Sequence, residues 1–330
     1  MDPTTPGPWL RPIGRPTGAT DRVSPAEADI PWIDIHQHTQ SLTWNDREAF
    51  DLSGGRAAVM IAAGYYWTPY RPIAPDDIRF LWDDALRRAE TFRRNHFYDQ
   101  YVAVGVHTWS RVEAVENLLA VLPDYCALDE VVAIGETGIE STQHTSAWDL
   151  EGQREIVREQ CHIARETDLP ILLHTPGSSK GDMPAWYADR YEEANESFTA
   201  SVLDAGTAKR DAFEIDLEVI EEAGLPHEQA VIDHAAPEIA PIVLEETGCH
   251  LAFTVGAEWL RGVSAGDVAD VIETHGPDRI LLDTDLFGAM RTDPFAMRRT
   301  IMALLQLGID PATVRQVVYE NPRDLLGLSV

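Results

Sequence analysis

Lysine is almost absent from this 330-residue chain: Lys180 and Lys209 are the only two, and every other permanent cation is an arginine. Aspartate and glutamate number 55 against 26 lysines and arginines, which gives a formal charge of -29. A lysine-poor, acidic surface stays soluble by self-repulsion that concentrated salt can screen, so it indicates a salt-adapted, halophilic protein. The same charge disfavours loose, non-specific binding to the phosphates of nucleic acid.

Cysteine and long apolar runs are also scarce. The 3 cysteines are widely spaced and form no C-x-x-C pair, which argues against a disulfide framework or a thiolate zinc site. No stretch approaches the length of a membrane span. The first 20 residues are rich in Pro, Gly and Thr and lack the apolar segment of a secretory signal. We therefore expect a soluble, cytoplasmic protein without a membrane partner.

Short apolar runs alternate with longer helical patterns along most of the chain, which is the rhythm of βα units around a parallel sheet. Most of the runs are almost continuously apolar, as expected for strands buried on both faces. Helical spacing follows at 76–95, 147–167, 237–247, 266–275, 294–307 and 311–328. The pattern predicts an α/β fold, a (β/α)8 TIM barrel, with strands at 32–35, 57–62, 101–106, 131–135, 171–173, 230–233, 250–254 and 280–283.

Two segments do not fit the repeating pattern. Residues 1–29 read as an N-terminal extension, which leaves 30–330 as a single barrel domain. The segment at about 177–226 is too long for a simple connection after the fifth strand. We expect it to form a helical insertion over one face of the barrel.

The first predicted strand ends in a pair of histidines, His36 and His38, within D-I-H-Q-H. Side chains alternate along a strand, so residues two apart point the same way, here into the barrel mouth. Two imidazoles placed in this way can bind one divalent cation. An H-x-H pair alone is a weak signal, because many such pairs are structural.

Four more ligand-type residues end later strands of the same barrel: Glu136, His174, His234 and Asp285. Barrel enzymes place their catalytic groups at this end of the strands. A single histidine there is more often a hydrogen-bonded core residue, but an ordered series is not expected by accident. Four histidines and two carboxylates are the right number for two divalent ions that share one bridging carboxylate. Glu136 fits the bridging position, and the ligand types suit Zn, Mn or Fe and also admit Mg.

Strand parity also predicts which neighbouring carboxylates face the site. Asp283 shares the parity of Asp285, and Asp34 shares that of His36, so both are expected to orient ligands. Asp233 precedes His234 by one residue and is therefore expected to face outward.

Five motifs of the chain together resemble those of TatD-type metal-dependent hydrolases, a branch of the amidohydrolase-like barrels. I-D-I-H-Q-H at 33–38 resembles the family's opening H-x-H strand, and V-G-V-H-T-W at 104–109 its G-x-H-P-W segment. I-G-E-T-G-I-E at 134–140 is similar to G-E-x-G-L-D, and L-L-D-T-D at 281–285 to the strand-eight E-T-D. E-N-P-R-D-L-L-G at 320–327 is similar to the closing N-x-x-x-L-F-G.

The resemblance implies that the protein binds two divalent ions and hydrolyses phosphodiesters or DNA. It also implies that the ligands of the ions are His36, His38, Glu136, His174, His234 and Asp285. Three departures concern the surroundings of these residues. D-H-A-A-P at 233–237 replaces the family's H-C-F-S/T-G run, Thr108 replaces a proline, and the segment after strand five is longer than usual.

As a hypothesis, Asp285 accepts the proton of the attacking water as general base, and Glu136 holds both metals. His107 follows strand three and is expected to contact a phosphate or carbonyl oxygen of the substrate, a structural hydrogen bond being the alternative. Lys180 and Arg291 are candidate contacts to an anionic substrate. A solvated loop lysine is the simpler interpretation of Lys180.

Three functions are compatible with these residues. The first is a metal-dependent hydrolase of phosphoesters, including a deoxyribonuclease, for which nucleic acid is expected as a substrate only. The second is a small-molecule amidohydrolase, lactonase or phosphotriesterase-like enzyme whose long insertion covers the substrate. The third is a catalytically idle metal-binding barrel, against which the complete ligand set argues.

Overall fold

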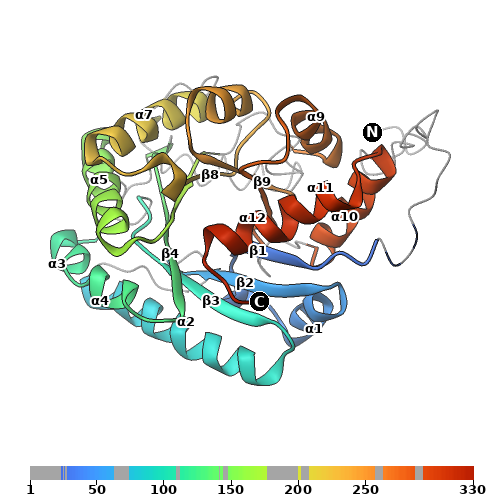
Figure 1. Ribbon diagram of the computed structural model, residues 1–330. Coiled ribbons are helices and arrows are strands. Elements are labelled where there is room, and N and C mark those ends of the chain that lie inside the picture. The colour runs from blue at the N-terminus through green and yellow to red at the C-terminus, as the bar shows by residue number, and fades with distance from the viewer. Residues whose placement is uncertain are drawn as a thin grey trace.

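Eight parallel strands form one sheet in the order β1-β2-β3-β4-β6-β8-β9-β10, curled into a barrel with helices outside it (Figure 1). The computed structural model describes residues 24, 26, 28–62, 74–108, 112–140, 142–143, 148–176, 200–201, 208–256, 263–286 and 293–330. The strands are β1 (Trp32–Gln37), β2 (Gly55–Ile61), β3 (Asp99–Val104), β4 (Val131–Thr137), β6 (Ile171–His174), β8 (Ala230–Asp233), β9 (His250–Thr254) and β10 (Ile280–Asp283).

The ring closes where the end of β10 meets the end of β1. Asp285 N donates to the carbonyl of His36 at 3.0 Å, and His38 N donates to the carbonyl of Leu286 at 3.0 Å. The Asp34 carboxylate ties the same two strands together, since it accepts from Thr284 N at 3.1 Å and Thr284 Oγ1 at 2.5 Å. Closure therefore brings the predicted ligands of the first and last strands side by side.

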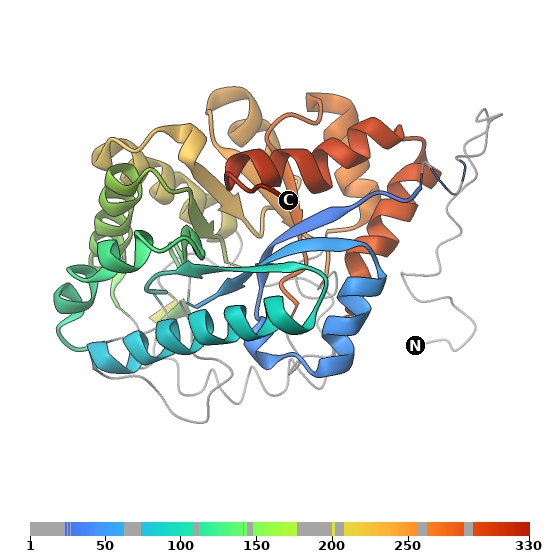
Figure 2. The same ribbon diagram turned by 60° about the horizontal axis from the view of Figure 1, so that its bottom comes forward.

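The outer helices begin at residues that satisfy the free N–H groups of a first turn. Asp149 caps α5 (Leu150–Thr167) and Ser264 caps α9 (Ala265–His275), whereas α2 (Pro75–Asn95) begins with Pro75, which has no N–H group that needs a partner. Figure 2 shows α2, in cyan, running across the outside of the strands. The other α-helices are α1 (Trp44–Leu52), α3 (Val115–Leu119), α4 (Leu122–Cys126), α7 (Ala208–Ala223), α10 (Ala296–Leu307), α11 (Pro311–Arg315) and α12 (Asn321–Leu325).

Shorter elements complete the described chain. They are the 3-10 turns η2 (Thr39–Ser41) and η3 (His227–Gln229), the π-helical turns η4 (Ile242–Glu246) and η6 (Gln316–Glu320), and the antiparallel pair β5 (Thr142–Gln143) and β7 (Ala200–Ser201).

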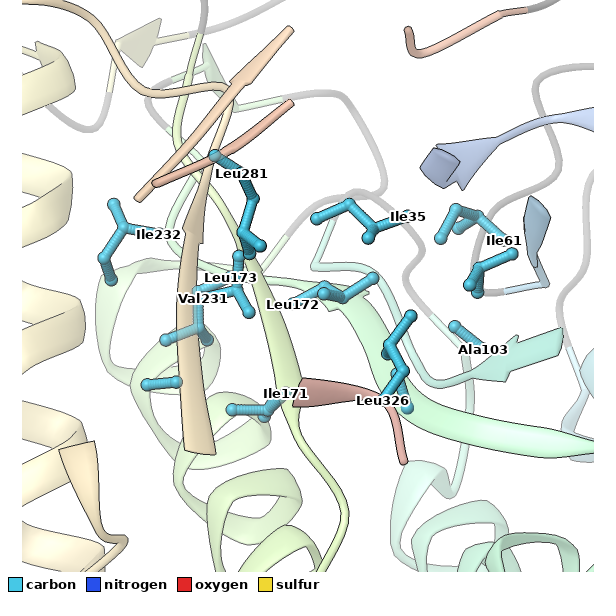
Figure 3. Packing of buried hydrophobic residues seen from close by; sticks show 14 of the residues in the cluster. Ile35, Ile61, Ala103, Ile171, Leu172, Leu173, Val231, Ile232, Leu281 and Leu326 are labelled. Carbon is cyan, nitrogen blue, oxygen red and sulfur yellow. The ribbon is translucent and has the colours of Figure 1, made fainter. Parts of the chain in front are cut away.

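One continuous apolar core fills the barrel and the space between strands and helices. Ile35, Ile61, Leu173 and Ile232 are each fully buried, and they come from four different strands. Leu326, next to the end of α12, belongs to the same cluster, as Figure 3 shows. Apolar burial on this scale is the main driving force for the fold, at about 25 cal/mol per Å² of apolar surface removed from water.

The predicted (β/α)8 barrel is confirmed, and each of the eight predicted strands overlaps an observed one. The helices α1, α3 and α4 were not predicted. Within the segment assigned to an insertion, α7 packs along α5, and Arg154 on α5 forms salt bridges with Glu218 and Glu222. Most of residues 1–29, and residues 177–199 and 202–207 of the expected insertion, lie outside the described residues. None of the described helices combines the length and the hydrophobicity that a membrane span requires.

His250, at the start of β9, makes the stability of this barrel sensitive to acid. Burial and then the nearby Arg279 lower its pKa from 6.5 to about 4. Its contribution to stability is complete above pH 6.5 and is lost as the pH falls toward 4, because the unfolded chain takes up a proton first. Between pH 8 and pH 5 we expect the wild type to lose about 2 kcal/mol more than the variant His250→Gln. Urea unfolding of both proteins at both pH values tests this, and parallel pH profiles would contradict it.

Candidate metal centre

The carboxyl ends of five strands converge on one buried cluster. It contains all six predicted ligands, each at most 3% exposed: His36, His38, Glu136, His174, His234 and Asp285. Charged and imidazole side chains are rarely buried in this number unless they are paired or bind ions. The barrel therefore brings together the residues that strand parity and strand order predicted.

Two glycines let the end of β4 approach β6 closely enough for this. Gly135 has φ +138°, and a Cβ there would lie 2.9 Å from both Cβ and O of Leu172. Gly138 has φ +141°, and a Cβ there would lie 2.3 Å from the carbonyl oxygen of His174. A side chain at either position would push the strands apart. The glycines of the G-E-T-G run thus place Glu136 beside His174.

Glu136 lies at the centre of the cluster, and its two oxygens face different partners. Oε1 lies 2.6 Å from His174 Nδ1 and 3.3 Å from His234 Nε2. Oε2 lies on the other side, 3.5 Å from His36 Nε2. The two oxygens therefore point toward different histidines, while the rings of His36 and His234 themselves lie side by side with centroids 4.8 Å apart.

Asp285 and the two histidines of β1 form the group on the Oε2 side. Asp285 Oδ1 is 3.2 Å from His38 Nε2 and 3.7 Å from His36 Nε2. The two imidazole Nε2 atoms are 3.3 Å apart and face one another. Asp285 has φ +44°, which turns its carboxylate back over the strand end toward these rings.

The charges in the cluster are strongly coupled. Burial alone would raise the pKa of Glu136, but His36 and His107 outweigh burial and hold it well below its ordinary value. Burial lowers the pKa of His174, yet hydrogen bonds to Glu136 and Glu140 outweigh that effect and raise it to about 9. Burial also lowers the pKa of His36, but the charges of Glu136 and Asp233 outweigh burial and raise that pKa well above 6.5. In the metal-free protein, protons on these imidazoles thus balance the buried carboxylates.

Asp233 faces the site, so the prediction that it faces outward is wrong. It is fully buried, and its Oδ2 accepts a hydrogen bond from His36 Nδ1 at 2.6 Å. The reason is the backbone of His234, which has φ +53° and so leaves the extended conformation on which strand parity depends. The turn lets two consecutive residues reach the same cluster. Burial raises the pKa of Asp233, but His234 and His36 outweigh it and leave that pKa below its ordinary value.

The two other carboxylates predicted to orient ligands occupy different environments. Asp34 accepts from His36 N at 3.3 Å and Gln37 Nε2 at 2.8 Å, so it supports the backbone of a ligand and not its ring. Burial raises its pKa to about 6, although these hydrogen bonds and those from Thr284 lower it. Asp283 lies within the cluster near His36, Asp233 and His234, and neither of its oxygens has a hydrogen-bond partner among the described residues.

Thr254 and Glu140 also orient histidines of the cluster, and neither was predicted from the sequence. Thr254 Oγ1, on β9, pairs with His234 Nδ1 at 2.6 Å, which leaves Nε2 facing Glu136. Glu140 Oε2 lies 3.1 Å from His174 Nε2. Glu140 could have been predicted, because it lies in the G-E-T-G-I-E run and strand β4 leads directly into the site. Thr254 gave no signal of its own.

His107 is fully buried beside the centre. Its Nε2 is 3.5 Å from Glu136 Oε1, and its ring packs edge-on against that of His174 with centroids 4.9 Å apart. Burial lowers the pKa of His107 despite Glu136, so its imidazole is neutral near pH 7. Thr108, which stands in the place of the family's proline, donates to the carbonyl of Gly138 at 2.6 Å. Lys180 and Arg291 lie outside the described residues.

The donor set fits divalent cations. Nitrogen and carboxylate oxygen atoms from His36, His38 and Glu136 lie within 4.8 Å of one another, as do those from His107, Glu136 and His174. Imidazole and carboxylate are the ligands that zinc and manganese accept. A positive charge between the facing imidazole nitrogens and the carboxylates stabilises this arrangement. Protons supply that charge here, and bound cations would supply it together with ligand bonds.

We expect Asp233→Asn to weaken metal binding without abolishing it. The carboxylate fixes the ring of His36, so its Nε2 faces the cluster, and loss of such a partner typically costs 10–100-fold in metal affinity. Activity of the variant should recover when metal is added in excess. Titrations of activity with Zn²⁺ for wild type and variant measure the shift. Identical metal dependence would contradict the role of Asp233.

Comparison with known proteins agrees with this geometry. Residues 33–202, just over half of the chain, match the model of the TatD related DNases. A metal-dependent hydrolase of Methanocaldococcus jannaschii is 24% identical over 291 residues, which span 88% of this chain and 98% of the relative.

Solved structures share the fold. A TatD-like protein from Archaeoglobus fulgidus aligns with a TM-score of 0.61 at 21% identity, over 90% of this chain and all of the other. The phosphotriesterase homology protein from Escherichia coli aligns with a TM-score of 0.58 at 13% identity, over 90% of this chain and 99% of the other. Fold, buried ligand cluster and relatives define a metal-dependent hydrolase built on a (β/α)8 barrel. The chain belongs to the TatD family.

Proposed function

We propose that the chain is a hydrolase with a dinuclear metal centre bridged by Glu136. The observation that carries this proposal is that the two carboxylate oxygens face separate sets of ligands. We name His36, His38 and Asp285, with Glu136 Oε2, the first-metal group. His174 and His234, with Glu136 Oε1, are the second-metal group. Glu136 would thus contribute one oxygen to holding each of the two cations.

The bound cations would polarise the scissile bond and lower the pKa of a water toward neutrality. Around them, the residues of this chain divide the remaining work. Asp285, at the open end of β10, accepts the proton of the attacking water. Asp233 and Thr254 fix the rings of His36 and His234, so that each presents its Nε2. His107 donates a hydrogen bond to a substrate oxygen next to Glu136.

We favour a phosphoester as the substrate, with a phosphodiester or DNA end as the leading candidate. Two comparisons support this choice: the family model is that of DNases, and the Escherichia coli phosphotriesterase homology protein was solved with phosphate in its active site. Lys180 and Arg291 are proposed as contacts to the anionic substrate. A small-molecule amide or lactone is the alternative substrate, because it requires the same metal chemistry.

A substrate screen tests this proposal. The protein is stripped of metal with a chelator, returned to high KCl, which screens its charge of -29, and loaded with Zn²⁺, Mn²⁺ or Mg²⁺. It is then assayed on bis(p-nitrophenyl) phosphate, short DNA duplexes, a lactone and an amide. We expect metal-dependent hydrolysis of the phosphodiesters. Hydrolysis of the lactone or amide alone would replace the substrate, and no hydrolysis with any metal would support the idle barrel.

A further inference from the structure

Lys209 is a buried lysine at a position where a lysine is unfavourable. It is 5% exposed and lies in the first turn of α7, where the helix dipole disfavours positive charge. Lysine is among the residues least often buried. The chain otherwise uses arginine almost throughout. The stability of α7 therefore does not explain a lysine at this position. The explanation lies in the hydrogen bonds that the lysine makes.

The ammonium group of Lys209 reaches the ends of two barrel strands. Nζ donates to the carbonyl of His234 at 2.5 Å and to Thr175 Oγ1 at 3.1 Å. Thr175 directly follows His174, and its hydroxyl in turn contacts the carbonyls of Asp233 at 2.7 Å and His234 at 3.1 Å. Lys209 thus connects α7 to the ends of β6 and β8.

These contacts fall on His234, the residue directly after β8, whose backbone is strained. His234 has φ +53°, a left-handed conformation that is strained for a residue with a side chain. The same turn brings Asp233 and His234 to face the cluster together. A carbonyl that accepts from both an ammonium and a hydroxyl is held more firmly than one with a neutral partner alone, because charge-assisted hydrogen bonds are the stronger ones.

We propose that Lys209 is a positioning residue for the second-metal group. Its ammonium fixes the left-handed turn at His234 and the strand end behind His174, and so sets the spacing of the two imidazoles that face Glu136 Oε1. The role rests on the proposed dinuclear centre. It predicts that loss of the ammonium weakens the second-metal site more than the first, since the first-metal group depends on this strand end only through the contact of Asp233 with His36.

Calorimetric titration of the metal-free protein with Zn²⁺ tests this role without reference to activity. The variants are Lys209→Met, which keeps the length of the side chain, and Arg210→Met as the matched control. Arg210 is the next residue of α7, is largely exposed and pairs with Glu214 at 2.7 Å. Wild type and Arg210→Met should take up two equivalents in two steps. In Lys209→Met, one step should weaken about 10–100-fold while the other changes much less.

The outcomes separate this inference from the proposed function. Wild type with fewer than two equivalents contradicts the dinuclear centre. Wild type with two equivalents and an unchanged Lys209→Met overturns the positioning role, as does equal weakening of both steps together with a lower Tm. If Lys209→Met does not fold, Thr175→Val removes the other donor to the same carbonyl. It should then weaken the same step by a smaller factor, and two unchanged steps would overturn the role.

Discussion

Glu136→Gln should lower hydrolysis by about 10²–10³-fold or more and reduce the metal bound per chain. The amide has the same shape, but only one of its two ends is an oxygen, so it cannot bridge two cations. In the structure the two oxygens of Glu136 point toward the first-metal group and the second-metal group respectively. Steady-state kinetics and metal analysis of the same preparation measure the two effects together.

A matched control lies next to the same strand. Glu130, just before β4, is partly exposed and pairs with Arg93 at 3.1 Å. Glu130→Gln should change neither turnover nor metal content, because a surface ion pair contributes little to stability and lies away from the cluster. Full activity of Glu136→Gln with two metals bound would show that the carboxylate is not a bridge.

Asp285→Asn should also produce a large loss, through kcat. A positioned general base contributes typically 10²–10⁴-fold, and asparagine cannot accept the proton of the water. The KM should change little, because the remaining ligands still place the substrate. Asparagine also keeps one oxygen toward His38 and His36, so at least part of the first-metal group survives.

The kinetic pattern distinguishes a base from a simple ligand. With excess Zn²⁺, kcat of Asp285→Asn should stay low, whereas a variant that only binds metal weakly recovers. Asp278→Asn, at an exposed aspartate just before β10 that accepts from Gln316 Nε2 at 2.8 Å, is the control and should behave as wild type. Recovery of Asp285→Asn by added metal would remove the general base role.

Sequence alone predicted the barrel and the convergence of its six ligand-type residues, because both follow from local rules. Apolar runs that alternate with helical spacing define βα units, and the ends of parallel strands in a closed barrel must meet. The prediction failed at Asp233 for a local reason. Strand parity holds only while the backbone stays extended, and His234 with φ +53° ends that regularity one residue after Asp233.

The partners that orient the ligands were beyond sequence reasoning because they come from distant parts of the chain. Thr254 pairs with His234 from the neighbouring strand, and Lys209 reaches it from α7, within the segment expected to form an insertion. Neither has a spacing or motif that marks it. Such contacts depend on the packing of α7 against α5 and on the order of strands in the closed sheet.

The metal content of the protein tests the central claim most directly. Protein loaded with Zn²⁺ in high KCl and then desalted is analysed by inductively coupled plasma mass spectrometry, beside Glu136→Gln treated in the same way. We predict two equivalents of zinc per chain for the wild type and fewer for Glu136→Gln. One equivalent or none in the wild type, or two in both proteins, would contradict a centre bridged by Glu136.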